Sequence, residues 1–597
     1  MRIVTGLAAS GKTSMLLREI AEKAEANRGR QILLVPELNS HQMERRLAAA
    51  THNHGARTAE VLTFSRLADR VFVVVGGLAQ QMLTPAGQLL TLQEAARRVQ
   101  VGLTAWSGLA DKPELLSETL ALIDECKSCM IEPETLFRAS KESALDEDAA
   151  LSAKLCDLAQ ILTQYDSLCE ETLPDPRDRL THLRDGLAES HVLDGAEVYL
   201  DGFLSYTPQE LAIIEVMLSS GVPLTAAVTC DVELPDVFVT GCRTLRTLTR
   251  MAERCSRRPE LVDLGAGKMP RPAGLAAVAN EALLPVRQAH EDASGVRLYE
   301  AASPFDECEH AAAYIRRKVR DEGAHYRDFV IAARDIGPYS ASLAMAMGRY
   351  DIPMFLADKP DLLSRPPMAL VIGALESVRS NFGCRELFGC LKTGLTGLAW
   401  DEIDRLENYA ITWKIHGAAW ERDWIEHPDG YGIPVDEAAQ MQLDELNELR
   451  ARAIAPFAAL RERLKGEQPS AECVRALYDF LLAVDAPRRM EERAAEHDAA
   501  GRLQLADEYR QLWEILVSAM EQFAWVRGDM PLTLDRFAQL FRLVLSGYSV
   551  GSIPVSLDRV SCGNIERVCG ENVKYVILLG VNDGLIPKDT SSASLIS

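Results

Sequence analysis

The sequence predicts an α/β protein with two parallel sheets, each interrupted along the chain by a long block of helices. Three observations support this prediction. Short apolar runs alternate with amphipathic helical segments in residues 1–75, the order that strand–helix–strand units produce. The same alternation returns after residue 295. The apolar periodicity is helical from about Pro85 to Leu187 and again from about Met368 to Leu545.

The first part begins as strand, glycine-rich loop and helix, and its sheet is expected to be completed after the first helical block. The run QILLVP (Gln31–Pro36) has the length of a buried strand, and EVYL (Glu197–Leu200) returns to that pattern. We therefore interpret the helical block as an insertion into one α/β domain. Gly265–Gly274, rich in glycine, proline and alanine, is expected to be a linker. The other expected elements are strands at Arg2–Thr5, Glu60–Thr63 and Leu224–Thr229, and helices at Thr13–Ala26 and Gln209–Leu218.

The second part follows the same plan, and its sheet is expected to gain a last strand at VKYVILL, just before the chain ends. No heptad array or short-period repeat interrupts either part. The expected strands are Val296–Glu300, Phe329–Ala333, Met354–Leu356 and Val573–Leu579, and the expected helices are Glu307–Glu322 and Tyr339–Tyr350.

Composition restricts the class of protein. A chain of 597 residues needs several domains, and 47% hydrophobic with 25% charged residues is ordinary for a soluble protein. No apolar run has the length of a membrane span and no signal pattern opens the chain, so we expect a cytoplasmic protein with no membrane partner. The net charge of −23 argues against nucleic-acid binding over the whole surface. It allows a basic channel inside an acidic shell, or a surface that faces another subunit.

The thirteen cysteines follow no even spacing, which argues against a disulfide scaffold in a chain of this size. Cys126 and Cys129 form a C-x-x-C within a helical pattern at Leu116–Met130, and no second pair lies near them in sequence. We interpret them as two thiols on one helix face; the alternative is half of a metal site. No metal cluster is predicted.

The segment Gly6–Thr13 fits the P-loop pattern G-x-x-x-x-G-K-[ST] and lies between an expected strand and an expected helix. Glycines let such a loop curl so that backbone N–H groups point at phosphate oxygens, and the helix N-terminus adds a favourable field. The lysine would reach the β and γ phosphates, and the threonine hydroxyl would hold Mg²⁺. The predicted nucleotide-binding residues are Gly6, Leu7, Ala8, Ala9, Ser10, Gly11, Lys12 and Thr13.

A P-loop needs an acidic partner on a neighbouring strand to hold Mg²⁺, and Asp201 is the candidate because it follows the strand Glu197–Leu200. The alternative is a turn residue, since Asp-Gly is a common turn pair. In an active ATPase of the helicase type the next residue is a glutamate that orients the attacking water. Here it is Gly202, which has no side chain for that task.

The order of several segments resembles AddB, the non-motor partner in the AddAB helicase–nuclease, which is called RexB in some lineages. The resemblance covers essentially all 597 residues, and the later segments are more specific than the P-loop. The matching segments of the first half are GLAASGKT, ILLVPELNSHQME, VLTFSRLADRVF and YLDGFLSYTPQE. Those of the second half are YRDFVIAARDIGPY, YDIPMFLADKPDLLSRPPM, LKTGLTG with EIDRLENYAITWKIHGAAW, and YVILLGVNDGLIP.

The resemblance implies a superfamily-one helicase architecture with two RecA-like P-loop domains, each carrying a large helical insertion. It also implies a subunit that binds ATP and Mg²⁺, pairs with an AddA-type helicase/nuclease as a heterodimer, and processes double-strand DNA ends for recombinational repair. The family threads single-stranded DNA and scans it for the recombination hotspot Chi. The expected boundaries are 1–80 (domain 1A), 81–190 (insertion 1B), 191–275 (1A and linker), 295–375 (domain 2A), 376–545 (insertion 2B) and 546–597 (return of 2A).

The sequence departs from the family pattern at several places. AddB proteins continue to an Mg²⁺-dependent nuclease stapled by an iron–sulphur cluster, and this chain stops before that region, so we expect a partial gene product without nuclease activity. Only five residues precede Gly6, which leaves no room for the upstream glutamine motif, and Thr225–Phe238 contains no Gly-Asp-x-x-Gln coupling motif. With Gly202, these absences predict that nucleotide is bound but hydrolysed poorly.

For DNA, the positions that match the family's strand-reading surface are Phe64 and Phe203 for base stacking and Arg66 for phosphate or base contact. The alternative for each phenylalanine is a place in the core. Leu38 stands where the family usually has glutamine, and Asp69 where it often has an aromatic residue. Both departures count against Chi recognition, whereas general binding of a single strand does not depend on them.

Arg334 follows the expected strand Phe329–Ala333, where a working helicase uses an arginine against the γ-phosphate; a surface salt bridge is the alternative. Two other functions compete with a DNA-reading subunit. An active superfamily-one helicase would need a glutamate after Asp201. A small-molecule P-loop kinase or an ATP-dependent regulator would account for the first fifteen residues and nothing afterwards.

Overall fold

The chain divides into two compact units, each with its own cores. Unit 1 consists of Met1–Met82, Ala121–Arg138 and Pro174–Glu300, and unit 2 of Leu83–Leu120, Ala139–Leu173 and Ala301–Ser597. The computed structural model describes residues 1–51, 58–78, 80–145, 148–265, 272–281, 289–356, 362–528, 530–548, 558–566 and 573–586.

Unit 1 is built on a parallel sheet of six strands in the order β3-β2-β4-β5-β1-β6. Parallel sheets of this kind are covered by helices on both faces, and the central strands β2, β4 and β5 are almost entirely buried. The strands are β1 (Arg2–Gly6), β2 (Arg30–Leu34), β3 (Ala59–Leu62), β4 (Ala196–Leu200), β5 (Leu224–Thr229) and β6 (Glu260–Asp263).

Alternate residues of these strands feed two different cores. Ile3 of β1 packs in the core that includes side chains of α3, α8, α9 and α10, whereas Val4 packs with α1 and α2. Successive side chains of a strand point to opposite faces, so the two helix groups cover opposite faces of the sheet. The helices are α1 (Lys12–Glu25), α2 (Ser40–Ala50), α3 (Phe64–Val75), α8 (Arg179–Ser190), α9 (Pro208–Ser219) and α10 (Val239–Arg254).

Unit 2 contains a parallel sheet of four strands in the order β12-β7-β11-β8, with α12 and α13 packed against it. Phe329 and Ile331 of β7 lie in its core with Cys308 and Ile315 of α12. The elements are α12 (Pro304–Glu322), β7 (Phe329–Ala333), α13 (Ser340–Arg349), β8 (Met354–Leu356), β11 (Val560–Asn564) and β12 (Tyr575–Leu579).

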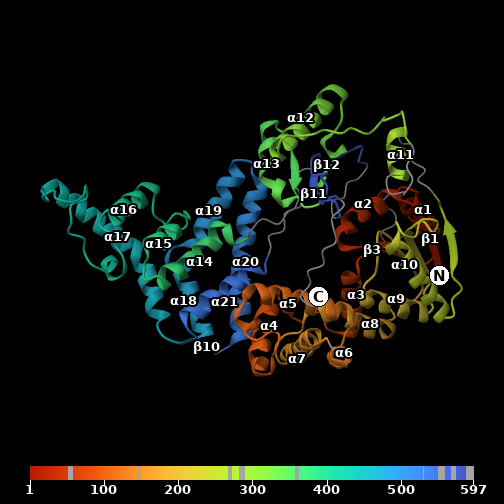
Figure 1. Cartoon of the computed structure of the whole chain (residues 1–597), viewed down its shortest axis with the longest axis horizontal. Coiled ribbons are helices and arrows are strands. Elements are labelled where there is room, and N and C mark those ends of the chain that lie inside the picture. Colours follow the sequence, from red (N-terminus) through yellow and green to blue (C-terminus); the bar gives the residue numbers. More distant parts are fainter. Residues whose placement is uncertain are drawn as a thin grey trace. The chain divides into compact units, whose positions relative to one another are not determined.

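The rest of unit 2 is a large helical region with its own apolar core (Figure 1). Helix α4 contributes Ala86 and Leu90 to this core and packs against α20 and α21, far along the chain. The helices that supply this core are α4 (Pro85–Val99), α14 (Pro366–Arg379), α15 (Cys384–Leu391), α16 (Trp400–Thr412), α17 (Glu437–Arg463), α18 (Ser470–Ala483), α19 (Ala486–Ala499), α20 (Leu503–Arg527) and α21 (Leu534–Ser546). The other α-helices of the described residues are α5 (Pro113–Ser128), α6 (Pro133–Leu145), α7 (Ala149–Glu171) and α11 (Ala273–Glu281), the last of which belongs to unit 1. The short strands β9 (Gln468–Pro469) and β10 (Pro531–Leu532) pair antiparallel.

The strand predicted at Val296–Glu300 is wrong. These residues have no regular secondary structure, and Leu298 is 96% exposed. Val296 and Leu298 alternate as in a strand, but neither is buried, so no apolar burial selects the extended pairing. Two strands of the large sheets were not predicted: β6, which is short and mixed in polarity, and β11, whose run VSCGN ends in a glycine and an asparagine. The two-residue strands β9 and β10 were not predicted either.

The other expectations fall partly outside the described residues. Of the linker Gly265–Gly274, residues 266–271 lie outside them, as do residues 549–557, 567–572 and 587–597 of the last expected segment.

Cys126 is buried on α5, and burial raises the pKa of its thiol to about 11. The described part of the chain contains no group of three or more His, Cys, Asp or Glu that could hold a metal ion. None of its helices is both long and apolar enough to cross a membrane.

A buried carboxylate organises the connection after α4. Asp157 of α7 is 1% exposed and accepts hydrogen bonds from the backbone N–H groups of Thr104 (3.0 Å), Ala105 (2.8 Å) and Trp106 (2.9 Å). Without this carboxylate, three successive N–H donors of the turn would lose their shared acceptor, and that of the buried Trp106 would be left without a partner, which is costly. One side chain therefore fixes where the chain turns between α4 and α5.

We expect Asp157→Asn to lower the stability of unit 2 by about 1–3 kcal/mol, because an amide oxygen accepts more weakly and its NH₂ group faces backbone donors. The measurement is the midpoint of urea unfolding followed by circular dichroism. Glu170→Gln, an exposed change on the same helix, is the control and should shift the midpoint little. Equal midpoints for the two variants would contradict the role of Asp157.

Candidate nucleotide-binding site

The loop between β1 and α1 has the backbone conformation of a tight phosphate cradle. Gly6, Ala9 and Gly11 have φ angles of 151°, 61° and 95°. A Cβ atom at Gly6 would lie 2.7 Å from Ser10 Oγ and 3.2 Å from the Gly265 carbonyl oxygen, so only glycine fits there. The loop opens at the carboxyl edge of the sheet, where α/β proteins bind ligands.

The Lys12 side chain is folded into the concave side of this loop. Its Nζ donates to the carbonyl oxygens of Gly6 and Leu7, each at 2.8 Å, and Ser10 Oγ lies at 3.5 Å. Burial lowers the pKa of Lys12, and the nearby charges of Asp201 and Cys230 oppose that shift. A buried cation at the N-terminus of α1 is therefore available to an anion.

Asp201 follows β4 at the same edge of the sheet and is 3% exposed. Its backbone N–H donates to the Leu34 carbonyl at 3.1 Å, which continues the pairing of β4 with β2. Burial raises the pKa of its carboxyl group, while a hydrogen bond with Thr13 and the charge of Arg46 oppose that shift. Oδ2 is buried without a hydrogen-bond partner among the described residues, so one ligand position of this carboxylate is open.

Gly202 has a φ of 82°, in the left-handed region that favours glycine. A Cβ atom there would lie 3.0 Å from Asn39 Nδ2 and 3.4 Å from Pro36 Cδ. Both the backbone conformation and the neighbouring side chains therefore disfavour a larger residue at this position. The glutamate that an active helicase has after Asp201 is therefore replaced by a glycine in a local structure that suits glycine.

A cluster that sequence reasoning missed ties the loop helix to the strand of Asp201. Lys23, in the last turn of α1, donates to Glu197 of β4 at 2.7 and 2.8 Å and to the Tyr199 hydroxyl at 2.9 Å. Its Nζ is also 2.7 Å from Glu19, and these hydrogen bonds raise the pKa of Lys23 despite its burial. Glu197 is a charged residue inside an otherwise apolar strand, the one sequence signal of this contact.

The end of β6 and the residues just after it form hydrogen bonds with the start of the loop. Asp263 Oδ1 accepts from Thr5 Oγ1 and from the Gly265 N–H, each at 3.1 Å. The Gly265 carbonyl in turn accepts from the Leu7 N–H at 3.1 Å. Because β6 was not predicted, this second contact was also missed.

The three predicted DNA-contacting residues differ in exposure: Phe64 is buried, Phe203 is half-buried and Arg66 is exposed. Phe64, the first residue of α3, is 5% exposed and its ring packs 5.7 Å from that of Phe203, which stacks on Tyr206 at 4.9 Å. Phe64 is therefore a core residue, the alternative given for it in the sequence analysis, and Phe203 is half-buried. Arg66 is exposed and paired with Glu44. Leu38 is 74% exposed, and Asp69 pairs with Arg179.

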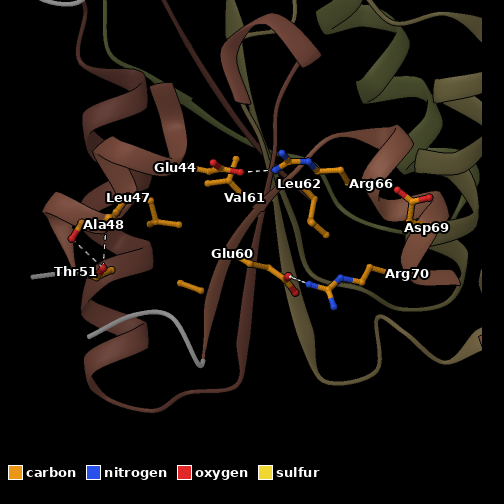
Figure 2. A pocket seen from close by; sticks show the side chains of 11 residues that line it. Glu44, Leu47, Ala48, Thr51, Glu60, Val61, Leu62, Arg66, Asp69 and Arg70 are labelled. Carbon is orange, nitrogen blue, oxygen red and sulfur yellow. Dashed lines mark hydrogen bonds and ion pairs between the residues drawn. The ribbon is translucent and has the colours of Figure 1, made fainter. Parts of the chain in front are cut away.

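Arg66 lines an open cavity of about 610 Å³ between α2 and α3, over the edge strand β3 (Figure 2). Arg66 pairs with Glu44 at one end, and Arg70 lies 3.2 Å from Glu60 at the other. Strand β3 is four positions from β1 in the sheet, about 19 Å at the usual strand spacing. Sheet geometry therefore separates Arg66 from the nucleotide loop.

Arg334 lies in unit 2 directly after β7 and pairs with Glu566, which follows β11. The pairing of Arg334 with Glu566 is the salt bridge that the sequence analysis gave as the alternative. Its role toward the γ-phosphate stays a prediction.

Comparisons with known proteins agree with the resemblance seen in the sequence. Residues 3–268 match the family model described as ADDB, N-terminal. The chain is 30% identical to the B subunit of the ATP-dependent helicase/deoxyribonuclease from Acetivibrio thermocellus and 29% identical to that from Clostridioides difficile, with the whole chain aligned in both cases. The protein of the same name from Desulforamulus reducens is 30% identical over the whole chain.

The chain spans about half of the length of these curated relatives, 53% in each of the three. The match to the N-terminal family model covers the nucleotide loop, Asp201 and all six strands of the first sheet. The alignment with the B subunits extends through both units. The chain is therefore similar to AddB-type B subunits along its whole length, and its first part matches the N-terminal model of the AddB family.

Proposed function

We propose that this chain is the helicase-like part of an AddB-type subunit, which binds Mg²⁺-ATP in its P-loop and serves as a DNA-reading partner without motor activity of its own. The complete assembly would process double-strand DNA ends for recombinational repair. One observation carries the proposal: a formed phosphate cradle lies beside a buried carboxylate, and the next residue is a glycine in a left-handed conformation.

The residues at the loop fit a nucleotide with a divalent cation. Lys12 offers a buried ammonium group, and α1 directs its N-terminal N–H groups toward the loop. Thr13 and Asp201 are the oxygen donors that would hold Mg²⁺, and Asp201 Oδ2 has an open position. Bound Mg²⁺ would neutralise phosphate charge. The Lys23 contacts would keep α1 and β4 in fixed relation, so that these donors stay together.

Gly202 takes the place of the acid that a motor would need after Asp201. Helicase-type hydrolysis needs a carboxylate that orients water beside the metal-binding aspartate. At this position the backbone has a φ of 82° and Asn39 lies 3.0 Å from the site of a Cβ atom. Nucleotide would therefore act as a structural ligand that stabilises unit 1 by mass action.

Single-stranded DNA is the proposed second ligand, with Arg66 and Phe203 as the exposed and half-buried candidates. The net charge of −23 means that phosphate contacts must be local. An AddA-type helicase/nuclease is the proposed protein partner, because the relatives are named as B subunits. It would supply the unwinding motor.

Lys12→Ala should weaken ATP binding roughly tenfold to hundredfold, because a charge-assisted hydrogen bond to phosphate is lost. The measurement is titration with a fluorescent ATP analogue. Arg18→Ala, which removes an exposed cation from the same helix, is the matched control and should bind normally. Equal affinity in Lys12→Ala and the parent chain would place the nucleotide elsewhere.

Asp201→Asn should reduce the gain in ATP affinity that Mg²⁺ provides by roughly tenfold, because a neutral amide holds the cation poorly. Affinities are compared with Mg²⁺ and with EDTA. Asp194→Asn, an exposed change just before the same strand, should leave the Mg²⁺ effect intact. A full Mg²⁺ effect in Asp201→Asn would assign the metal to another carboxylate.

The purified chain should hydrolyse ATP below roughly 0.1 s⁻¹ with or without single-stranded DNA, at least tenfold under the usual enzyme range. Gly202→Glu should not raise this rate, because glutamate does not readily adopt the backbone conformation there. Phosphate release is the measurement, with an active superfamily-one helicase as the positive control. Strong stimulation by single-stranded DNA would assign motor activity to this chain instead.

A further inference from the structure

A ladder of aromatic rings runs from the helical core of unit 2 to its surface. It begins at Phe388 and Trp420, which are 2% and 0% exposed, and ends at Tyr431, which is 92% exposed. Neighbouring rings are 4.4–6.4 Å apart, in the range of favourable aromatic contacts. In order, the ladder consists of Phe388, Trp420, Trp424, Tyr409, Trp413 and Tyr431.

The loop between α16 and α17, which carries Trp420, Trp424 and Tyr431, is held by several hydrogen bonds. The Tyr409 hydroxyl lies 3.0 Å from the carbonyl oxygen and 3.1 Å from the N–H of Glu426. Trp413 Nε1 donates to the His427 carbonyl at 3.0 Å. Asn447 of α17 bonds both the N–H and the carbonyl of Trp424, at 2.7 and 3.0 Å. The loop is therefore anchored in place before any partner binds.

This anchored loop nevertheless presents apolar side chains to solvent. Ile425 is 74% exposed, Tyr431 92%, Ile433 46% and Val435 41%. We call these four residues the apolar tip. Clustered exposure of large apolar side chains on an ordered loop is typical of an interaction site. The hydrogen bonds described above hold residues 424–427, so the backbone on both sides of Ile425 is fixed.

The surroundings of the apolar tip are acidic. Residues 421–437 contain six Asp or Glu and one Arg. Two of the acids are paired, Glu421 with Arg461 and Asp423 with Arg450. The other four form no ion pair with Lys or Arg in the part of the chain that the structure describes; they are Glu426, Asp429, Asp436 and Glu437. This rim repels nucleic-acid phosphates and also a second copy of the same surface.

We propose that the apolar tip is a preformed docking surface for the partner subunit, and that this partner offers an apolar pocket for Tyr431 surrounded by Lys and Arg. The acidic rim defines the charge of the complementary surface, and the ladder supplies a rigid aromatic anchor that loses little conformational entropy on binding. The identity of the partner, an AddA-type helicase/nuclease, rests on the function proposed above.

The test is titration calorimetry of this chain with the purified partner subunit at two salt concentrations. Tyr431→Ser combined with Ile433→Ser should weaken binding about thirtyfold or more, because an anchor and its neighbour are lost. Tyr431→Phe should bind nearly as tightly as the parent chain. Met345→Ser, which removes an exposed apolar side chain from α13, is the matched control. The parent affinity should fall as salt rises.

The outcomes separate the docking role from the function proposed above. Unchanged affinity in the double variant, with ATP binding intact, overturns the docking role and leaves the proposed function standing. A parent chain that binds ATP but forms no complex with the partner overturns both the docking role and the proposed partner. A parent chain that dimerises in light scattering, and loses the dimer in the double variant, assigns the apolar tip to self-association and also overturns the proposal.

Discussion

Two opposite charges buried at one edge of a parallel sheet, the Lys12 ammonium and the Asp201 carboxylate, determine the chemistry available to unit 1. A buried charge is costly unless hydrogen bonds or an opposite charge stabilise it. The loop carbonyls hold Lys12, and Thr13 contributes to the stability of the Asp201 carboxylate. Parallel pairing brings the ends of β1 and β4 to the same edge with β5 between them, so the two charges face one space.

The helical region of unit 2 follows the same physical rule with different partners. Asp157 satisfies backbone donors, and Arg527 of α20 is 3.1 Å from Glu94 of α4 in a pair that is almost fully buried. Burial lowers the pKa of Arg527 to about 10, and the carboxylate opposes that shift. The Arg527–Glu94 pair joins segments more than 400 residues apart within one unit and helps to specify that α20 meets α4.

The sequence predicted the elements whose pattern is local. The buried strands Leu224–Thr229 and Phe329–Ala333 have the bounds expected from their apolar runs, and Asp201 follows a strand as predicted. Contacts between segments far apart in the sequence could not be predicted from local patterns. The Lys23–Glu197 pair joins residues 174 positions apart, and no periodicity reports it. At Val296–Glu300 the local pattern led to a wrong prediction, because its alternating apolar side chains are not buried against any sheet.

The strand order of the first sheet also has a consequence for synthesis on the ribosome. Strand β1 is made first, but its two neighbours are β5 and β6, which end at residues 229 and 263. At about 5–20 residues per second, β1 waits roughly 10–50 s before both of its edges can be paired. Until then the nascent chain holds an apolar strand without its sheet, the condition in which chaperones are needed. The phosphate cradle follows β1 directly in the sequence, yet it is therefore among the last parts of unit 1 to take shape.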